Sequence, residues 1–218
     1  MDTSKQIQDI IDRATLLNAR ADQIKVSVGE LIDAVKQLYE NTETPIATIF
    51  SQRDPAWAKD NMGVSGGTIA KYGCLMCCLA SILKDAGYDT DPRRLNAWLN
   101  ANGGYVNGAN LSNFALIESF KVVKLVRPVI FTPTPSGATV ALDKARATID
   151  AGGFATVMVD FNGAPHSAEK DVAMHWVRWL GVNDTVMEPW EGKIMPISPR
   201  FGKTPSVSIW RVALYQKA

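Results

Sequence analysis

The sequence is sparse in the residues that build disulfide frameworks and metal sites. It has three cysteines and two histidines, and the cysteines, Cys74, Cys77 and Cys78, all fall within one short segment. Disulfide geometry is specific, so cysteines on one helix cannot pair comfortably, and no disulfide framework is expected. The spacing of Cys74 and Cys77 leaves a redox pair or half a zinc site open, but no second Cys-x-x-Cys completes a zinc site. We therefore expect no metal and no other cofactor.

The chain also lacks an excess of charge and a long apolar run. Its formal net charge is +1 and its basic residues form no stripe, so we expect no nucleic-acid partner. No stretch reaches the roughly 18 apolar residues of a membrane span, so we expect no membrane insertion. The N-terminal residues lack the apolar core of a secretory signal, which predicts synthesis in the cytoplasm without a signal peptide.

Residues 1–40 carry a regular apolar repeat. Apolar or small residues occupy the heptad positions a (Ile7, Ala14, Ala21, Val28, Val35) and d (Ile10, Leu17, Ile24, Leu31, Leu38). This spacing predicts a parallel coiled coil, and the alternative is one amphipathic helix packed on its own domain. Apolar Ile11 and Ile32 at position e suit three or more helices, so we expect a homo-oligomer, a trimer or a dimer. Residues 41–48 are expected to form a linker, because polar residues and Pro45 end the helix.

Residues 49–218 are expected to form one α+β domain. The expected helices cover 75–87, 92–100, 112–120 and 142–151, and the expected strands cover 122–126, 129–131, 155–160, 175–182, 185–187 and 207–213. Helices come first and strands gather later, which favours α+β over a doubly wound parallel sheet. Asp91 is predicted to cap the second helix, with Pro92 at its first position.

Cys74 is the first candidate for chemistry. It follows Gly73 and opens the apolar run Cys74–Leu83, so its sulfur would lie at a helix N-terminus. The helix dipole and the free N–H groups there stabilise a thiolate, which is the nucleophilic form of cysteine. The alternative is a small buried hydrophobe, and we expect that role for Cys77 and Cys78 in the body of the helix.

His175 is the candidate base, because it heads an apolar segment and imidazole titrates near neutral pH. The other histidine, His166, lies in a polar segment and is expected to be solvated. A third group must orient the imidazole, and Glu188, one strand and turn later, is the first choice. Its rivals are Asp160, Asp171 and Asp184, while Glu191 is expected to face solvent.

Gln52 is the last candidate. Its side-chain amide, together with the backbone N–H of Cys74, could form an oxyanion hole for the tetrahedral intermediate of acyl transfer. One such donor is typically worth roughly 10²–10³ in rate.

Six short motifs occur in an order that resembles a known family. They are Gln52-x-Asp54-Pro-x-Trp57, Tyr72-Gly-Cys74-x-x-x-x-Leu-Ala80, Gly87-Tyr with Pro92-x-x-Leu95, Gly103-Gly-Tyr105, His175-Trp-Val177 with Gly181, and Pro189-Trp-x-Gly192. Over about residues 50–195 they resemble the papain-like cysteine peptidases of the peptidase-thirty-nine-like group, relatives of the domain that cleaves double-glycine bacteriocin leaders.

The resemblance implies a papain-like α+β fold, with Cys74 as nucleophile, His175 as base, Glu188 as orienting acid and Gln52 as oxyanion donor. Two positions depart from the family pattern. The family usually has aspartate where Glu188 stands. Its Gly-Pro-Thr-Ser-type residues after the nucleophile are replaced here by Leu75-Met76-Cys77-Cys78.

These residues predict a cysteine peptidase or amidohydrolase. Members of the group with helical stalks occur in phage and cell-wall contexts, so the resemblance implies a phage-associated enzyme acting on peptidoglycan peptides or on a virion protein. Two alternatives stay open. One is a papain-like domain without catalysis that serves as an oligomeric structural or binding module of a virion. The other is acyl transfer by the same three side chains.

Overall fold

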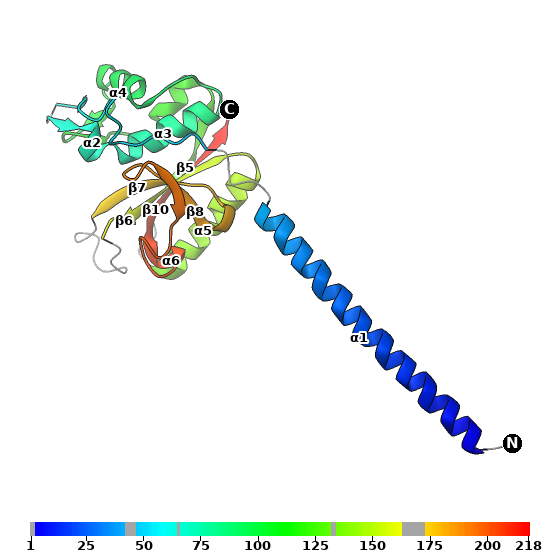
Figure 1. Ribbon diagram of the computed structural model, residues 1–218. Coiled ribbons are helices and arrows are strands. Elements are labelled where there is room, and N and C mark those ends of the chain that lie inside the picture. The colour runs from blue at the N-terminus through cyan, green and yellow to red at the C-terminus, as the bar shows by residue number, and fades with distance from the viewer. Residues whose placement is uncertain (1–2, 42–46, 65, 132–133, 163–172) are drawn as a thin grey trace. The chain divides into compact units, whose positions relative to one another are not determined.

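The computed structural model describes residues 3–41, 47–64, 66–131, 134–162 and 173–218. The chain divides into two compact units, Met1–Ile46 and Ala47–Ala218. The described part of the first unit is a single helix, α1 (Thr3–Asn41), drawn in blue in Figure 1. No helix in the described ranges is long and apolar enough to cross a membrane.

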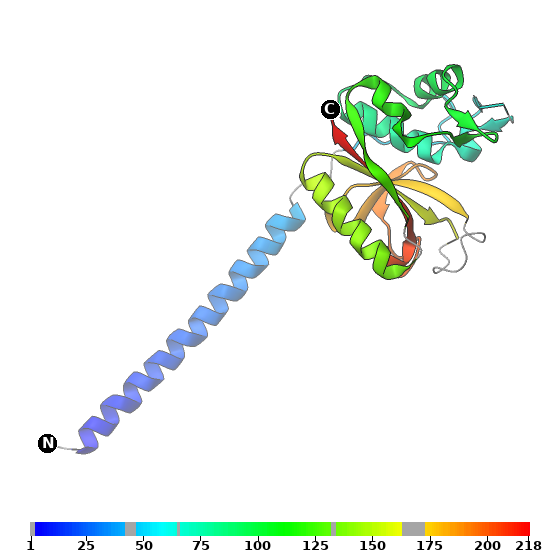
Figure 2. The same cartoon turned by 180° about the vertical axis from the view of Figure 1, so that it is seen from behind.

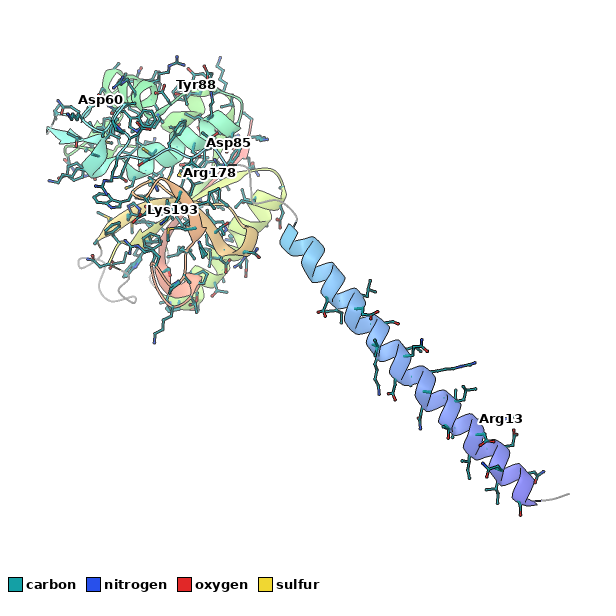
Figure 3. All side chains as sticks on the ribbon, viewed as in Figure 1. Arg13, Asp60, Asp85, Tyr88, Arg178 and Lys193 are labelled. Carbon is teal, nitrogen blue, oxygen red and sulfur yellow. The ribbon has the colours of Figure 1, made fainter. Side chains whose placement is uncertain are left out.

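The side chains described on helix α1, which Figure 3 draws as sticks, include exposed apolar residues. Ile10, Leu17 and Leu31 each have 64% to 65% of their surface accessible. An isolated helix gains little stability from its own backbone, so most helical stability comes from burying such a stripe. The described part of α1 leaves such a stripe exposed within this single chain.

The second unit is built around a six-stranded antiparallel sheet. Its strands are β5 (Val123–Phe131), β6 (Phe154–Asp160), β7 (Met174–Trp179), β8 (Thr185–Glu188), β9 (Lys193–Pro196) and β10 (Ile209–Lys217), in the order β5-β10-β6-β7-β8-β9. Strand β6 is buried over its whole length because it lies inside the sheet with both faces covered. The unit is α+β, as predicted.

Helices cover both faces of this sheet (Figures 1 and 2). Helix α3 (Cys74–Asp85) packs on β7 and β6, and α5 (Pro135–Asp150) packs on β10 and β6. Successive β6 side chains divide between the two layers, since Val157 packs with Leu142 of α5 whereas Met158 packs near Cys74 of α3.

The remaining elements are short. They are β1 (Asn61–Met62), β2 (Gly67–Thr68), α2 (Ile69–Tyr72), α4 (Pro92–Ala101), β3 (Tyr105–Val106), β4 (Asn110–Leu111), the 3₁₀ helices η1 (Phe114–Phe120) and η3 (Val182–Asp184), and α6 (Pro205–Ser208). The predicted cap of α4 is confirmed, because the side chain of Asp91 accepts the N–H of Arg94 at 2.8 Å. The helix expected at 112–120 is a 3₁₀ helix.

Helix α5 is longer than predicted. It begins at Pro135, and the side chain of Thr134 caps it by accepting the N–H of Gly137 at 3.2 Å. Gly137 and the β-branched Thr139 and Val140 are weak helix formers, so the sequence pattern did not predict the first two turns of α5. Strand β9 was not predicted, and the strand expected from 207 begins instead at 209, after α6.

Strand β5 is continuous, although two separate strands were expected around Pro128. Proline cannot donate to a ladder and is tolerated in edge strands and at bulges. Strand β5 is the edge of the sheet, and its register against β10 shifts between Val212, opposite Ile130, and Leu214, opposite Val126. This bulge accommodates the proline and lets one strand run through it.

Candidate active site

Cys74 is the first residue of α3, directly after the short helix α2. A side chain at Gly73 would lie 2.6 Å from the carbonyl oxygen of Ile69, so only glycine lets the two helices join this closely. The thiol of Cys74 is half-buried, whereas Cys77 and Cys78 are fully buried, as expected for the helix body. The backbone N–H of Leu75 donates to the Cys74 sulfur.

His175 is the second residue of β7, and only 4% of its surface is exposed. Its Nε2 donates a hydrogen bond to Oε1 of Glu188, the last residue of β8. The Glu188 carboxylate also accepts the backbone N–H groups of Trp190, at 2.9 Å, and of Glu191. A buried carboxylate with this many donors is held in one orientation and stays ionised.

The other side of the His175 ring is hydrogen-bonded to the thiol of Cys74. Burial lowers the pKa of His175, but the hydrogen bonds and negative charges of Cys74 and Glu188 outweigh it and raise the pKa to about 9. Burial likewise raises the pKa of Cys74, but the bond to His175, its positive charge and nearby backbone N–H groups bring the pKa below its ordinary value. Both directions favour a thiolate paired with an imidazolium.

For Glu188, burial raises the pKa, and the bond to His175, its charge and the two backbone N–H groups bring it below 4.5. The carboxylate is therefore ionised at neutral pH and stabilises the imidazolium.

Gln52 lies in a loop that is fastened to the turn after β8. Its backbone N–H donates to the carbonyl oxygen of Pro189 at 2.8 Å, and its Nε2 donates to the carbonyl oxygen of Ala70 at 2.8 Å. Trp57 supports the loop, because its Nε1 donates to the carbonyl oxygen of Ser51 at 2.7 Å. An amide nitrogen carries two hydrogens, so Nε2 of Gln52 can still donate to a bound ligand.

A cavity of about 1110 Å³ opens above these groups. Cys74, His175 and Gln52 line it together with six aromatic residues, Tyr72, Tyr105, Phe114, Phe161, Trp176 and Trp190. A mostly apolar lining with a few convergent polar groups is typical of a small-molecule or peptide site.

Aromatic rings surround the imidazole of His175. The ring of Phe161 lies 5.1 Å from it, edge-on, and the ring of Phe201 lies 5.8 Å from it. Trp190 contacts Phe161 in turn, at 5.4 Å. These rings keep water from the hydrogen bond to Glu188, which strengthens it. No local sequence signal identified Phe161 or Phe201, since their roles depend on which strands are neighbours.

The rival carboxylates have other partners. Asp160 is buried at the end of β6 and accepts the backbone N–H of Asn162 at 2.8 Å. Asp184 binds Arg146 at 2.9 Å. Glu191 is exposed, as expected. Asp171 and His166 lie outside the described residues.

No protein-family model matches the chain, and a comparison with curated proteins gives no match. Among solved structures, the chain is similar to a crystal structure from Bacillus anthracis that is provisionally described as a C39-like peptidase. The two share 15% sequence identity with a TM-score of 0.43, over 79% of this chain and 98% of that chain. At this level of similarity, no residue role or activity is carried over from that protein.

Proposed function

We propose that this protein is a cysteine peptidase or amidohydrolase that cleaves a peptide or amide bond. The supporting observation is the continuous hydrogen-bonded series from Cys74 through His175 to Glu188, which meets an open cavity at the sulfur. A nucleophile, a base and an orienting acid in contact are the parts that covalent acyl transfer requires.

The arrangement supports a two-step reaction. The Cys74 thiolate attacks the carbonyl carbon, and the oxyanion is stabilised by Nε2–H of Gln52 and by the backbone N–H of Cys74, which is free of a helical partner at the first turn. His175 then protonates the leaving amine, and the acyl-thioester forms. His175 next takes a proton from water, which attacks the thioester and regenerates the thiolate. Glu188 holds the imidazole through both steps.

The charges of the residues that line the cavity indicate which class of substrate it suits. It includes the cations Lys71 and Arg211, and the described lining contains no carboxylate side chain. This charge distribution suits a substrate that carries carboxylates, as the peptides of peptidoglycan do. Together with the family resemblance, it supports a peptidoglycan peptide as substrate, with a virion protein as the alternative and a phage association as the setting.

We further propose that residues 1–40 assemble copies of this chain into a trimer or dimer. The described a and d side chains of the repeat are apolar or small, and the large ones are exposed on α1. The flanking cations Arg13 and Lys25 are paired on their own helix with Asp9 and Asp22, both at 3.0 Å, so they do not require an acidic partner.

The peptidase proposal is tested by incubating the protein with a peptide mixture and with purified peptidoglycan, and identifying products by mass spectrometry. We expect new amino and carboxyl termini that are absent when Cys74→Ala replaces the wild type. Products joined to an added amine instead of water would indicate acyl transfer. If the wild type and Cys74→Ala give the same products, or if neither cleaves anything, the peptidase proposal is wrong and a binding module is supported.

A further inference from the structure

The first half of β7 has an edge without a partner strand. Pairing with β8 covers only Arg178, opposite Met187, and Trp179, opposite Val186. Strand β8 ends at Glu188, and Pro189 has no N–H to continue the ladder. On this edge, the backbone N–H and C=O groups between the start of β7 and Trp176 therefore need other hydrogen-bond partners, because buried backbone groups are rarely left unpaired.

In an antiparallel strand, the N–H and C=O of one residue point to the same edge. The backbone N–H and C=O of Trp176 both form hydrogen bonds with cysteine sulfur atoms of α3. The N–H donates to the sulfur of Cys74, and the carbonyl oxygen accepts from Sγ of Cys78 at 3.6 Å. Cys74 and Cys78 are four residues apart, so they lie on one face of the helix and reach both groups of a single residue.

Cys78 is suited to this bond and not only to filling space. It is fully buried and packs with Leu180, which follows β7, and with Met187 of β8. Burial raises the pKa of Cys78 well above its ordinary value, so it remains a thiol and keeps its S–H donor. Cys77, the neighbouring buried cysteine, packs instead in the helical core with Leu79 and Leu95.

We propose that Cys78 is a positioning residue, whose bond to the carbonyl oxygen of Trp176 holds that residue so that its N–H faces the sulfur of Cys74. Cys78 thus acts on the nucleophile through one backbone residue of β7, without touching the substrate. The inference rests on the proposed function only in taking Cys74 as the reactive thiol.

The test compares Cys78→Ala, which removes the donor, with Cys78→Ser, which keeps one. The first readout is the alkylation rate of Cys74 by iodoacetamide against pH, followed by mass spectrometry of the Cys74 peptide. We expect Cys78→Ala to raise the pKa of Cys74 and to slow alkylation at about pH 6 by roughly three- to tenfold. Cys78→Ser should stay within about twofold of the wild type. Cys77→Ala is the matched control and should leave the rate unchanged.

The second readout is hydrogen exchange of the Trp176 amide, which does not depend on enzyme activity. We expect faster exchange in Cys78→Ala than in Cys78→Ser. If both variants behave alike in both readouts, the proposal is wrong, even if Cys74 is a reactive nucleophile. If wild-type Cys74 alkylates like free cysteine but the Trp176 exchange rates differ as expected, the peptidase proposal fails and the role of Cys78 in holding Trp176 stands. If Cys78→Ala does not fold, Cys78→Val replaces it as the variant that fills the space without a donor.

Discussion

The backbone N–H of Gln52 donates to the carbonyl oxygen of Pro189 at 2.8 Å. This single bond ties the loop that carries the candidate oxyanion donor to the turn that follows the candidate acid, Glu188. Gly192 closes the same turn, with its N–H donating to the carbonyl oxygen of Glu188 at 2.9 Å, and a side chain there would lie 2.8 Å from Cβ of Ser51. The two segments that carry these candidate residues are therefore held at a fixed separation by backbone contacts.

Gly192→Ala should disturb this separation. The residue has φ of +65°, and its new methyl group would push against Ser51. We expect a loss of about 1–2 kcal/mol in the free energy of unfolding from the left-handed backbone alone, with a further loss of kcat from the displaced loop. Gly103→Ala is the matched control, since it has the same φ of +65° but open space around it. Equal kcat in the two variants would contradict the coupling between Gln52 and the turn.

Gln52→Ala should lower kcat by roughly 10²–10³, because it removes one donor to the oxyanion. The alkylation rate of Cys74 by iodoacetamide should stay close to that of the wild type, since this reaction forms no oxyanion. Steady-state kinetics and alkylation measured on the same preparation separate the two effects. A parallel fall in both would mean that Gln52 acts on the thiol and not on the intermediate.

Glu188→Gln should move the pH profile of alkylation. The charge of Glu188 helps to raise the pKa of His175 to about 9, so its removal should lower that pKa and shrink the pH range in which thiolate and imidazolium coexist. Glu188→Asp keeps the charge one methylene shorter and should retain more of the range. Profiles of Glu188→Gln and wild type that superimpose would show that the carboxylate does not act on the imidazole.

Stability should depend on His175 in a defined pH window. Its pKa rises from 6.5 to about 9 on folding, so the stability it contributes is fully present below about pH 6.5 and is lost as the pH rises through about 9. We expect His175→Gln to destabilise the protein by about 3 kcal/mol below that window and by much less above it. Chemical denaturation of both proteins at the two pH values measures the difference. A destabilisation that grows with pH would contradict the assigned charge.

A second buried ion pair lies away from the cavity. Arg178 donates to Asp85 and, at 2.6 Å, to the hydroxyl of Ser81, and Figure 3 labels the two charged residues. Asp85→Asn leaves a buried cation without its counter-charge and should cost about 3–5 kcal/mol in the free energy of unfolding. Asp184→Asn is the control, because its pair with Arg146 is half exposed and should cost less than about 1 kcal/mol. Similar losses in both variants would contradict the burial of the first pair.

The coiled-coil proposal is tested on two adjacent leucines of α1. Leu17 occupies a d position and Leu16 lies outside the seam, although both are exposed on the single helix. Leu17→Glu should dissociate the oligomer, whereas Leu16→Glu should leave it intact, as measured by light scattering. A wild-type protein that is a monomer at micromolar concentration would contradict the proposal.

Local patterns predicted those parts of the fold that depend on neighbouring residues. The cap at Asp91, the start of α3 after Gly73 and the buried run of β6 are all visible in short segments. Strand β9 and the first turns of α5 were missed because their residues have weak intrinsic preferences, which tertiary packing overrides.

The site was predictable in its chemical groups but not in its surroundings. Cys74, His175, Glu188 and Gln52 were predicted as candidates from residue type, order and family resemblance, and the fold brings the first three into hydrogen-bonded contact and places Gln52 in the lining of the same cavity. The ring of Phe161 and the backbone of Trp176 could not be predicted, since their contacts arise from the order of β6, β7 and β8 and from the point where pairing of β7 and β8 stops.

In the proposed reaction, His175 holds the Cys74 sulfur as a thiolate. The decisive measurement is the alkylation rate of Cys74 by iodoacetamide, from about pH 4 to 10, in the wild type and in His175→Ala. We predict rapid alkylation that persists well below the pKa of free cysteine, about 8.5, in the wild type and is lost in His175→Ala. A single rise near about pH 8.5 that is the same in both proteins would contradict the claim.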